Sequence, residues 1–462
     1  MPTEHPASSL ALPSRREFVK TTSALAVGGA ALATGLSTAR AAQALGDKEI
    51  KIALIGCGGR GTDAAVQALS TKGKVTLWAM ADAFSPQVER SLDKIKRTLE
   101  QRWGSDSAER IKSAIQVPAE RQFAGFNAFQ QAIDSGVDVV VHATPPGFRP
   151  QHFEAAIEAG KHVFMEKPVA SDAAGVRQVL AAAEEAKKKG LKVGVGLQRH
   201  HQAGYIETVK RLHEGAIGDI VAMRAYWNGN RPWQKKRADL NKQYGKELTE
   251  MEYQLRNWYY FTWLSGDHIA EQHIHNLDVI NWVKKAHPVK ARAMGGREIS
   301  NGGADDGEIY DHFAVQFEYE DGSICYSECR HQPGCWNSVS EYAQGTKGKS
   351  VISAHQIFAD DQWRYKAEGA KDPYQQEHDD LFTAIRQNKD FNEAVYGAES
   401  TMTSILGRMA AYSGKELEYS KALASKIELL PESLAWDAKP RVLPGADGLY
   451  QRAIPGKTDV LG

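Results

Sequence analysis

Residues 49–61 of this chain read EIKIALIGCGGRG, and this stretch decides its fold. A short apolar run with β-branched residues predicts a buried strand, and the glycine-rich segment after it predicts a tight turn into a helix. Gly56 allows the turn, Gly58 lets a pyrophosphate approach the backbone, and Gly61 lets the helix pack closely on the strand. Asp82 ends the next expected strand, where its carboxylate can accept hydrogen bonds from ribose hydroxyls. The pattern predicts a dinucleotide site; the alternative is a glycine-rich turn without a nucleotide.

The same loop favours one dinucleotide over the other. The N–H groups of the first helical turn are expected to face the phosphates, so Gly59 and Arg60 join the expected cofactor-binding residues. Ala83 follows Asp82, and no arginine stands beside that acid in the sequence. An NADP site commonly has an arginine near the ribose 2′-phosphate, so the sequence favours NAD.

Strand and helix patterns alternate up to about residue 200. Strands are expected in KVTLWAMAD, VDVVVHATPP, KHVFMEKP and LKVGVGLQRH. Between them lie helical segments, one of which is expected to begin at an N-cap on Ser171 and to end at Gly190. Apolar strands separated by helices predict a parallel sheet covered on both faces. We expect an α/β fold with a Rossmann domain over residues 48–198.

The pattern changes after residue 200. Strands are expected in IVAMRAYWNG, VKARAMGGRE, DHFAVQFEYEDGSICYSECRH and KGKSVISA, with a hairpin turn at Asp321-Gly322. Few helical segments separate them, which predicts a more antiparallel sheet in a second, α+β domain. We place this domain at residues 199–430 and a C-terminal tail at 431–462.

Composition excludes some partners. The 462 residues carry 57 basic and 57 acidic side chains, so the formal net charge is zero. This balance offers no basic field for nucleic acid or for an anionic membrane surface. Beyond the N-terminal segment we find no apolar run long enough to span a bilayer. The four cysteines are expected to be free thiols, with a Cys329–Cys335 disulfide as the alternative.

The N-terminus has the order of a twin-arginine export signal. SRREFVK at 14–20 contains the pair Arg15 and Arg16, an apolar run follows, and ARA at 39–41 is an A-x-A cleavage site. We expect residues 1–41 to be removed and the mature protein to be periplasmic. This route carries folded proteins, so a cofactor would be loaded before export. The alternative is a cytoplasmic tail with two chance arginines.

Further motifs resemble one enzyme family. EKP at 166–168 and TPP at 144–146 each end an expected strand, and the chain also contains HFEAAIEAGKHVFMEKP, DLFTAIRQNKDF and ILGRMAAYSGKEL. Over roughly residues 49–420 the chain resembles the glucose–fructose oxidoreductase/inositol dehydrogenase/MocA (Gfo/Idh/MocA) family. The resemblance implies a Rossmann domain and a C-terminal domain with an open sheet. That sheet often forms the interface of a homo-oligomer, which here would be a dimer or a tetramer.

The resemblance also implies roles for residues at the strand ends. Lys167 matches the family lysine beside the nicotinamide and the reacting hydroxyl, where a cation stabilises an alkoxide as it forms. The alternative for Lys167 is an ordinary surface lysine. The other cofactor contacts expected in this region are Thr144, Pro145, His152 and Glu166.

A second signature is SGDHIAEQHIHNLDVINW at 265–282. It resembles the family pattern D-x-x-x-H-x-x-D, with Glu271 in the first place, His275 as the acid/base and Asp278 in the last place. We expect one helix with positions 268, 271, 275, 278 and 282 on one face. Glu271 would then fix the tautomer of His275 and raise its basicity. His268 is expected to contact substrate; a metal held by His268, Glu271 and His275 is the less favoured alternative.

Two aromatic segments flank that region, YWNGNRPWQKKR at 226–237 and YQLRNWYYFTWL at 253–264. Aromatic faces together with amide and guanidinium groups suit a carbohydrate, so Tyr226 and Trp258 are expected to bind substrate. Arg199 in LQRHH offers a further polar group. The alternative for each aromatic residue is ordinary core packing.

These features predict an NAD-dependent oxidoreductase of sugars, polyols or their derivatives. The periplasm holds no usual pool of free NAD, which favours a tightly bound cofactor restored by coupled oxidation and reduction of two sugars. Two alternatives stay open. One is a redox-neutral glycosidase that oxidises, eliminates, hydrates and reduces in turn, and the other is a non-catalytic sugar-binding protein.

Overall fold

The computed structural model describes residues 48–298, 303–367, 369 and 371–462. The expected export signal at 1–41 lies outside these residues. Within the described part of the chain, no helix is long and apolar enough to cross a membrane. All four cysteines are free thiols, and Cys335 is the exposed one.

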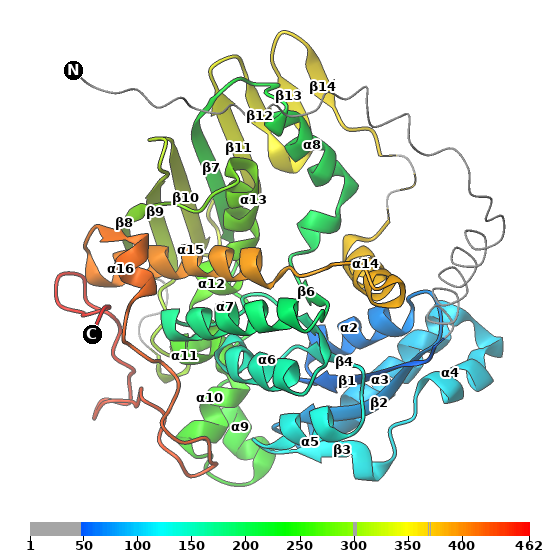
Figure 1. The fold of residues 1–462 in the computed structure, drawn as a ribbon. Helices are drawn as coiled ribbons and strands as arrows, with labels where there is room; N and C mark the ends of the chain where they lie inside the picture. The colour runs from blue at the N-terminus through cyan, green and yellow to red at the C-terminus, as the bar shows by residue number, and fades with distance from the viewer. Residues whose placement is uncertain (1–47, 299–302, 368, 370) are drawn as a thin grey trace, which may run out of the picture. The chain divides into compact units, whose positions relative to one another are not determined.

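Six parallel strands form the first sheet, as the alternating pattern predicts (Figure 1). Their order is β3-β2-β1-β4-β5-β6, which is that of a Rossmann domain. The strands are β1 (Ile50–Ile55), β2 (Val75–Asp82), β3 (Gln122–Ala124), β4 (Val139–His142), β5 (His162–Met165) and β6 (Val193–Val195). Their carboxyl ends share one edge of the sheet, and this edge borders the site described below.

Helices cover both faces of this sheet because its strands are apolar on both sides. Ile52 and Leu54 of β1 face one core, while Ala53 and Ile55 face the other. The first core is completed by α2 (Gly59–Leu69), α3 (Ser85–Trp103) and α4 (Ala108–Ala114), and the second by α5 (Ala128–Asp134), α6 (Arg149–Glu158) and α7 (Ala173–Lys188). The N-cap of α7 is Asp172 and not the expected Ser171, because the Asp172 carboxylate accepts a hydrogen bond from the Gly175 N–H at 2.7 Å.

Nine strands form the second sheet, which is mixed and mostly antiparallel. Within the described part of the chain, β7 and β10 are the only neighbouring pair of this sheet that runs parallel. In spatial order the strands are β14 (Gln362–Arg364), β13 (Gln356–Phe358), β12 (Lys349–Val351), β11 (Ser338–Gly345), β7 (Ile220–Gly229), β10 (Ile324–His331), β9 (His312–Glu318), β8 (Lys290–Gly296) and β15 (Leu417–Glu418). Five of the observed strands were not predicted from the sequence because they are short or rich in polar residues: β3, β11, β13, β14 and β15.

The two faces of the second sheet differ. One face packs on α13 (Ile274–Lys284) and α15 (Ala394–Ser413). The other face presents rows of side chains in register across β8, β9, β10, β7 and β11, and two of these are the exposed Met294 and Tyr326. Tyr226 lies in the same row as Met294, because paired residues in neighbouring strands point to the same side.

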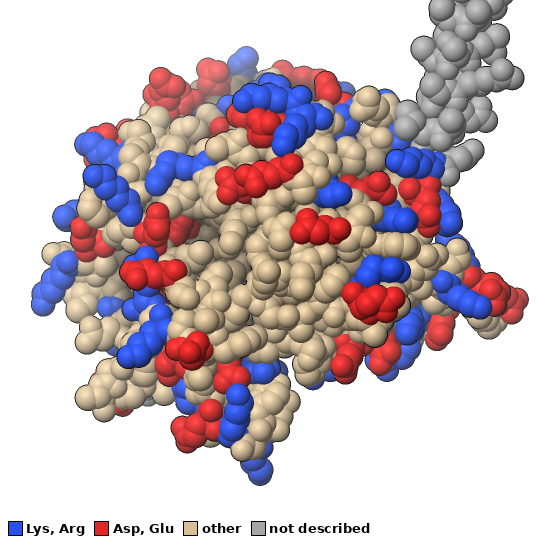
Figure 2. Space-filling model, turned by 60° about the horizontal axis from the view of Figure 1, so that its bottom comes forward, with Lys and Arg blue, Asp and Glu red and all other residues tan. Residues whose placement is uncertain are grey.

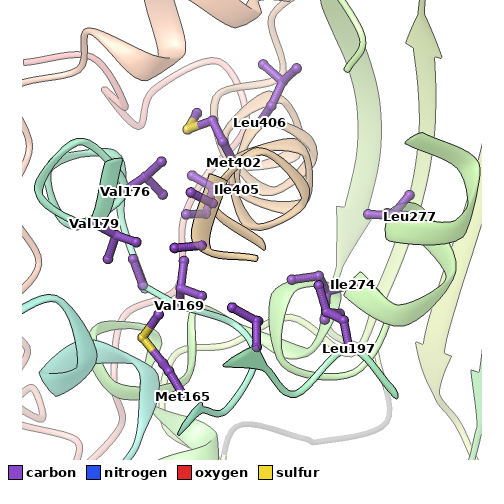
Figure 3. Close-up of a cluster of buried hydrophobic side chains, with 14 of the residues drawn as sticks. Met165, Val169, Val176, Val179, Leu197, Ile274, Leu277, Met402, Ile405 and Leu406 are labelled. Carbon is purple, nitrogen blue, oxygen red and sulfur yellow. The ribbon is translucent and has the colours of Figure 1, made fainter. Parts of the chain in front are cut away.

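α15 connects the two sheets through a shared apolar core. Figure 3 shows Met402, Ile405 and Leu406 of α15 between Val176 and Val179 of α7 on one side and the Ile274–Leu277 turn of α13 on the other. Gly407 lets α15 approach the second sheet closely, since a Cβ atom there would lie 2.9 Å from Cζ of Phe317. This core holds the first sheet and the second in one folding unit.

Two later segments also pack around the first sheet. α14 (Pro373–Gln387) follows β14 of the second sheet in the sequence but lies on α2, where Leu381 and Phe382 enter the core of the Rossmann sheet (Figure 1). The second segment comprises α9 (Arg237–Tyr244), α10 (Glu250–Arg256) and the turn Trp258–Tyr260. We call residues 231–260 the cap. A capping box at Thr249 and Glu252 starts α10.

The C-terminal tail packs against the cap and against the first sheet's end of the cavity. The indole of Trp436 contacts the rings of Phe84 and Phe126 at centroid distances of 5.2 and 4.7 Å. The Tyr450 hydroxyl donates to a Glu250 carboxylate oxygen at 2.6 Å and accepts from Arg237 at 2.9 Å. These contacts hold the cap on the first sheet's carboxyl edge.

Candidate active site

A cavity of about 820 Å³ lies at the carboxyl ends of the parallel strands. This volume falls in the range of small-molecule and cofactor sites. Its walls are the glycine loop after β1, the ends of β2, β4 and β5, the cap, and the region of α12 (His268–Glu271) and α13.

The glycine loop has the shape that a dinucleotide needs. Gly56 has a positive φ of 94°, and a Cβ atom there would lie 2.6 Å from the backbone of Ala143. A Cβ atom on Gly61 would lie 2.0 Å from the Gly56 carbonyl oxygen, so only glycine permits this helix–strand packing. A Cβ atom on Gly58 would meet no atom within 4 Å, although Gly58 lines the cavity, so this glycine keeps the backbone open to a ligand.

The start of α2 is suited to a phosphate. Gly58 is its N-cap, Gly59 is its first residue, and among the described residues no side chain caps this end and the first turn has no acid. The N–H groups of such a turn and the helix dipole attract an anion. Gly59 and Gly61 line the cavity beside them.

Asp82 lies at the end of β2 beside this loop. Its Oδ2 accepts a hydrogen bond from the Cys57 N–H at 2.7 Å, and its Oδ1 accepts from the Phe84 N–H at 3.0 Å. Burial raises the pKa of Asp82, although these hydrogen bonds oppose the change. Each carboxylate oxygen can accept a second hydrogen bond, so the group remains able to bind ribose hydroxyls.

Arg60 lines the cavity, and its side chain forms two ion pairs. Its Nε contacts Oε1 of Glu166 at 2.5 Å, and its Nη2 contacts Oε1 of Glu377 in α14 at 2.9 Å. Both carboxylates are almost completely buried, and burial together with the charge of Glu166 raises the pKa of Glu377 well above its usual range. Arg60 therefore fixes Glu166, the residue before Lys167, against α2 and α14.

Lys167 faces the other end of the cavity. Its Nζ donates to the Glu271 carbonyl oxygen at 2.5 Å and lies 3.2 Å from Oε2 of the same residue. The two side chains are 14% and 12% exposed. Lys167, Glu271 and His275 all line the cavity, so residues distant in the sequence share one site.

The expected single helix over 268–282 is wrong. The structure has two helices, α12 and α13, separated by Gln272 and His273. The His273 N–H reaches back five residues to the His268 carbonyl oxygen at 3.2 Å, which widens the turn, and α13 starts again at Ile274. Glu271 and His275 line the cavity, whereas His268 and Asp278 do not.

The expected pairing of Glu271 with His275 is also wrong. The Glu271 carboxylate binds Lys167, and the buried Nδ1 of His275 has no hydrogen-bond partner among the described residues. Burial, together with the nearby charges of Lys167 and Arg199, lowers the pKa of His275 well below its usual value. His275 is thus neutral near pH 7 and less basic than expected.

Four expected cofactor contacts line the cavity: Thr144, Pro145, His152 and Glu166. Nε2 of His142 lies 2.6 Å from the Thr144 hydroxyl and 3.1 Å from Nδ1 of His152. Burial lowers the pKa of His152 to about 3, so both imidazoles are neutral. The Phe129 ring stacks on His152 with a centroid distance of 3.9 Å, which holds its orientation.

Among the expected substrate contacts, Trp258 lines the cavity and the others lie elsewhere. Arg199 forms a buried ion pair with Glu341 of β11. Asp278 accepts hydrogen bonds from His200 and from Ser400 of α15, each at 2.9 Å. Tyr226 lies on the opposite face of the second sheet, and its neighbour Trp227 stacks on His275 at a centroid distance of 5.9 Å. A strand alternates its faces, so one residue of offset decides which side chain reaches the site.

His268 is also placed away from the cavity. It is buried, and its Nδ1 lies 3.1 Å from Oδ1 of Asp267 and 3.2 Å from the Tyr310 carbonyl oxygen. Within the described residues, no group of three or more His, Cys, Asp or Glu side chains is arranged to hold a metal ion. His268, Glu271 and His275 accordingly form no such group.

Several lining residues were missed by sequence reasoning. They come from the cap and from the start of α6, and they include Arg149, Trp233, Tyr244 and Arg256. Arg149 is buried, and its Nη1 donates to the Pro168 carbonyl oxygen at 2.5 Å. Burial lowers the pKa of Arg149 to about 10. The folding of the cap onto the first sheet brings the other three to the site. Trp233 and Arg256 lie in the two aromatic segments that the sequence singles out, whereas no local signal marks Tyr244.

Comparison with known proteins identifies the family. Residues 50–196 match the profile described as "Oxidoreductase family, NAD-binding Rossmann fold", and residues 205–350 match the "GFO/IDH/MocA C-terminal domain". The chain belongs to the Gfo/Idh/MocA family. The first profile is that of an NAD-binding Rossmann domain, and the glycine loop described above fits a dinucleotide.

Individual Gfo/Idh/MocA relatives are distant. scyllo-Inositol 2-dehydrogenase (NADP(+)) IolW of Bacillus subtilis strain 168 is 28% identical over 191 residues, which cover 40% of this chain and 44% of the relative. Inositol 2-dehydrogenase of Acidothermus cellulolyticus is 26% identical over 260 residues, 56% of this chain and 60% of the relative. A 2,7-anhydro-N-acetylneuraminate hydratase of Escherichia coli K12 is 26% identical over 226 residues, 47% of this chain and 51% of the relative. The chain thus spans about half the length of these curated relatives.

Solved structures share the fold. Aldose-aldose oxidoreductase from Caulobacter crescentus, complexed with glycerol, aligns with a TM-score of 0.60 at 19% identity and covers 80% of this chain and 100% of its own. scyllo-Inositol dehydrogenase from Lactobacillus casei, with bound NAD(H) and scyllo-inositol, aligns with a TM-score of 0.58 at 19% identity and covers 81% and 100%. At this identity the likeness shows the common fold.

Proposed function

We propose that the protein oxidises or reduces a CH–OH group of a sugar, a polyol or one of their derivatives, with NAD as its cofactor. The observation that carries the proposal is Lys167 Nζ held against Glu271 in the cavity that the fingerprint glycines border. A bound nicotinamide supplies the hydride acceptor or donor. The residues of this chain handle the charge and the proton.

Lys167 is suited to bind the reacting oxygen. An ammonium group has three N–H donors, and Glu271 engages two of them through its carbonyl and carboxylate oxygens. The third is available to a substrate oxygen, where it stabilises the negative charge that develops as the hydroxyl proton leaves. Glu271 thereby orients the ammonium.

His275 is suited to take that proton. Its lowered pKa keeps the imidazole neutral near pH 7, so a ring nitrogen can accept a proton. The buried Nδ1 has no partner among the described residues, and Trp227 fixes the plane of the ring. The relatives described above include two inositol dehydrogenases, and these support a polyhydroxylated substrate.

The test uses the whole protein with added NAD and a panel of sugars, polyols and glycosides. Absorbance of reduced nicotinamide and mass analysis of the products are followed together. Reduced nicotinamide with an intact carbon skeleton supports the proposal. If no compound reduces the cofactor, the proposed reaction is wrong.

A redox-neutral reaction is the second candidate. One relative is named a hydratase, an activity without net oxidation, and this observation favours the candidate. The same assay separates the two functions. The redox-neutral reaction is supported if an aglycone is released, or water is added, while no net reduced nicotinamide forms.

We further propose that the protein is exported with its cofactor bound. The twin-arginine pattern at 14–20 and the cap over the cavity support this proposal. Cell fractionation of the full chain, compared with a variant carrying Lys at both Arg15 and Arg16, tests it. Equal cytoplasmic retention of both proteins would contradict export.

We also propose a homo-oligomer through the open face of the second sheet. Met294 is 78%, Tyr326 49% and Trp336 60% exposed there, and the Trp336 ring contacts Tyr226. On the face shown in Figure 2, by contrast, basic and acidic side chains are interspersed. Light scattering measures the molar mass in solution of the wild type and of Tyr326→Arg. The proposal requires a smaller molar mass for the variant, because the introduced charge would disrupt the interface.

A further inference from the structure

Two arginines share the Asp82 end of the cavity. Asp82 at the end of β2, Phe84 at the N-cap of α3 and Arg90 within α3 border it on one side. Tyr244 and Arg256 border it from the cap. Arg256 is 174 positions from Asp82 in the sequence, yet its charge acts on the carboxyl group and opposes the rise of the Asp82 pKa. No arginine stands beside Asp82 in the sequence, but folding brings the charge of Arg256 close to it.

Arg256 is held in one place by aromatic rings. Its guanidinium carbon lies 3.9 Å from the centroid of the Phe84 ring and 4.0 Å from that of Tyr244. Its Nη1 donates to the Tyr244 hydroxyl at 2.8 Å. Phe84 in turn is fixed by its backbone bond to Asp82 and by the Trp436 ring of the tail.

Among the described residues, this guanidinium donates one hydrogen bond, from Nη1 to the Tyr244 hydroxyl. Arginine has five N–H donors, and the buried Nε of Arg256 has no hydrogen-bond partner among the described residues. Arg90 adds a second positive charge, which together with burial lowers the Arg256 pKa. Two carboxylates, those of Glu252 and Asp82, act on the Arg256 charge in the opposite direction, and of these Asp82 lines the cavity.

We propose that Arg256 is a determinant of cofactor choice that acts against Asp82. Its planar guanidinium is the group that would hold a phosphate on the ribose 2′ position, and the negative charge of Asp82 is what excludes that phosphate. The inference rests on dinucleotide binding in this cavity. It implies that neutralising Asp82 alone lets the protein bind NADP, with no new arginine.

The physical reason lies in the charges. A 2′-phosphate carries negative charge, so an ionised Asp82 at the ribose repels it. The neutral amide of Asn removes this repulsion and keeps hydrogen-bonding capacity, while Arg256 offers a fork that matches a phosphate. A phosphate–guanidinium bond of this kind changes affinity by about tenfold or more.

The test measures equilibrium dissociation constants of NADH and NADPH by nucleotide fluorescence in the wild-type protein and three variants. Asp82→Asn should gain about tenfold or more in NADPH affinity. Arg256→Met keeps the apolar stem between Phe84 and Tyr244, and should lower NADPH affinity more than NADH affinity. The double variant should lose the gain made by Asp82→Asn. The gain should also shrink as salt is raised, because it comes from a charge pair.

Arg90→Met in the Asp82→Asn background is the matched control. If the NADPH gain survives removal of Arg256 but not of Arg90, the assignment to Arg256 is wrong. If Arg256→Met weakens both nucleotides by the same factor, Arg256 only packs against the adenosine and the inference fails. Failure of the wild type to bind either nucleotide would instead contradict dinucleotide binding itself, so the two failures are distinguishable.

Discussion

The ammonium nitrogen of Lys167 lies 2.5 Å from the carbonyl oxygen of Glu271 and 3.2 Å from its carboxylate. Lys167 follows β5 of the first sheet, and Glu271 ends α12, which packs against α15. This contact joins the two halves of the cavity. Since both side chains are largely buried, each depends on the other for charge compensation.

Lys167→Ala should abolish hydride transfer and leave nucleotide binding nearly intact. The ammonium faces the reacting oxygen, whereas the phosphates are expected at the start of α2. Removing a charge directed at the transition state costs about 3–4 kcal/mol, or roughly a hundredfold to a thousandfold in rate. Single-turnover reduction and nucleotide titration measure the two effects. A rate near that of the wild type would remove Lys167 from the mechanism.

His275→Asn should lower kcat more than it raises KM, because a proton acceptor acts in the chemical step. The lowered pKa of His275 means that its neutral form persists as the medium is acidified. The wild-type kcat should therefore stay level from about pH 8 to pH 6 and fall only in more acid solution, where the imidazole becomes protonated. A KM effect alone in the variant would assign His275 to binding.

Gly58→Ala and Gly61→Ala form a matched pair in the fingerprint loop. A methyl group on Gly58 would enter open space, so we expect the free energy of unfolding to change by no more than about 0.5 kcal/mol while nucleotide affinity falls. A methyl group on Gly61 would collide with the Gly56 carbonyl, so we expect a loss of about 1–3 kcal/mol or more. Denaturant unfolding and nucleotide titration separate the two effects. Equal destabilisation would contradict a ligand role for Gly58.

Glu308→Gln should change how stability depends on pH. Burial raises the pKa of Glu308 from 4.5 to about 7, and its Oε2 has no partner among the described residues. A raised pKa favours the folded state below pH 4.5, and this contribution is lost as the pH rises toward 7. The variant should lack that loss, so above pH 7 its free energy of unfolding should exceed that of the wild type by up to about 3 kcal/mol. Parallel stability curves in denaturant from pH 5 to pH 8 would contradict this.

The sequence predicted the parts of the site that local motifs define. The turn at Gly56, the position of Asp82 and the strand before Lys167 follow from patterns within a few residues. The break after Glu271 was missed because the segment 268–282 satisfies a helical spacing, and only the packing shows two helices. Arg256 could not be found because no local pattern places the cap on the first sheet.

Burial also changed roles that residue type suggested. Arg199 is a polar residue at a strand end, but it forms a buried ion pair with Glu341 of β11, a strand that the sequence analysis missed. Tyr226 and Trp227 are equally plausible from composition, and the register of β7 decides that Trp227 faces His275.

The nucleotide carried by the protein tests the export proposal. Wild-type protein purified without added nucleotide should release about one NAD(H) per chain on denaturation, which implies a dissociation constant below micromolar and more than about 8 kcal/mol of binding free energy. Absorbance and mass analysis of the supernatant measure it. Free exchange with micromolar affinity and no released nucleotide would contradict a cofactor carried through export.

The central claim is that Lys167 serves hydride transfer to or from a polyhydroxylated substrate. The most direct measurement is single-turnover reduction of bound NAD in wild type and in Lys167→Ala, followed by nicotinamide absorbance over a panel of sugars and polyols. We predict that at least one compound reduces the wild-type cofactor and leaves that of the equally loaded variant oxidised. Reduction at the same rate in both proteins, or in neither with any compound, would contradict the claim.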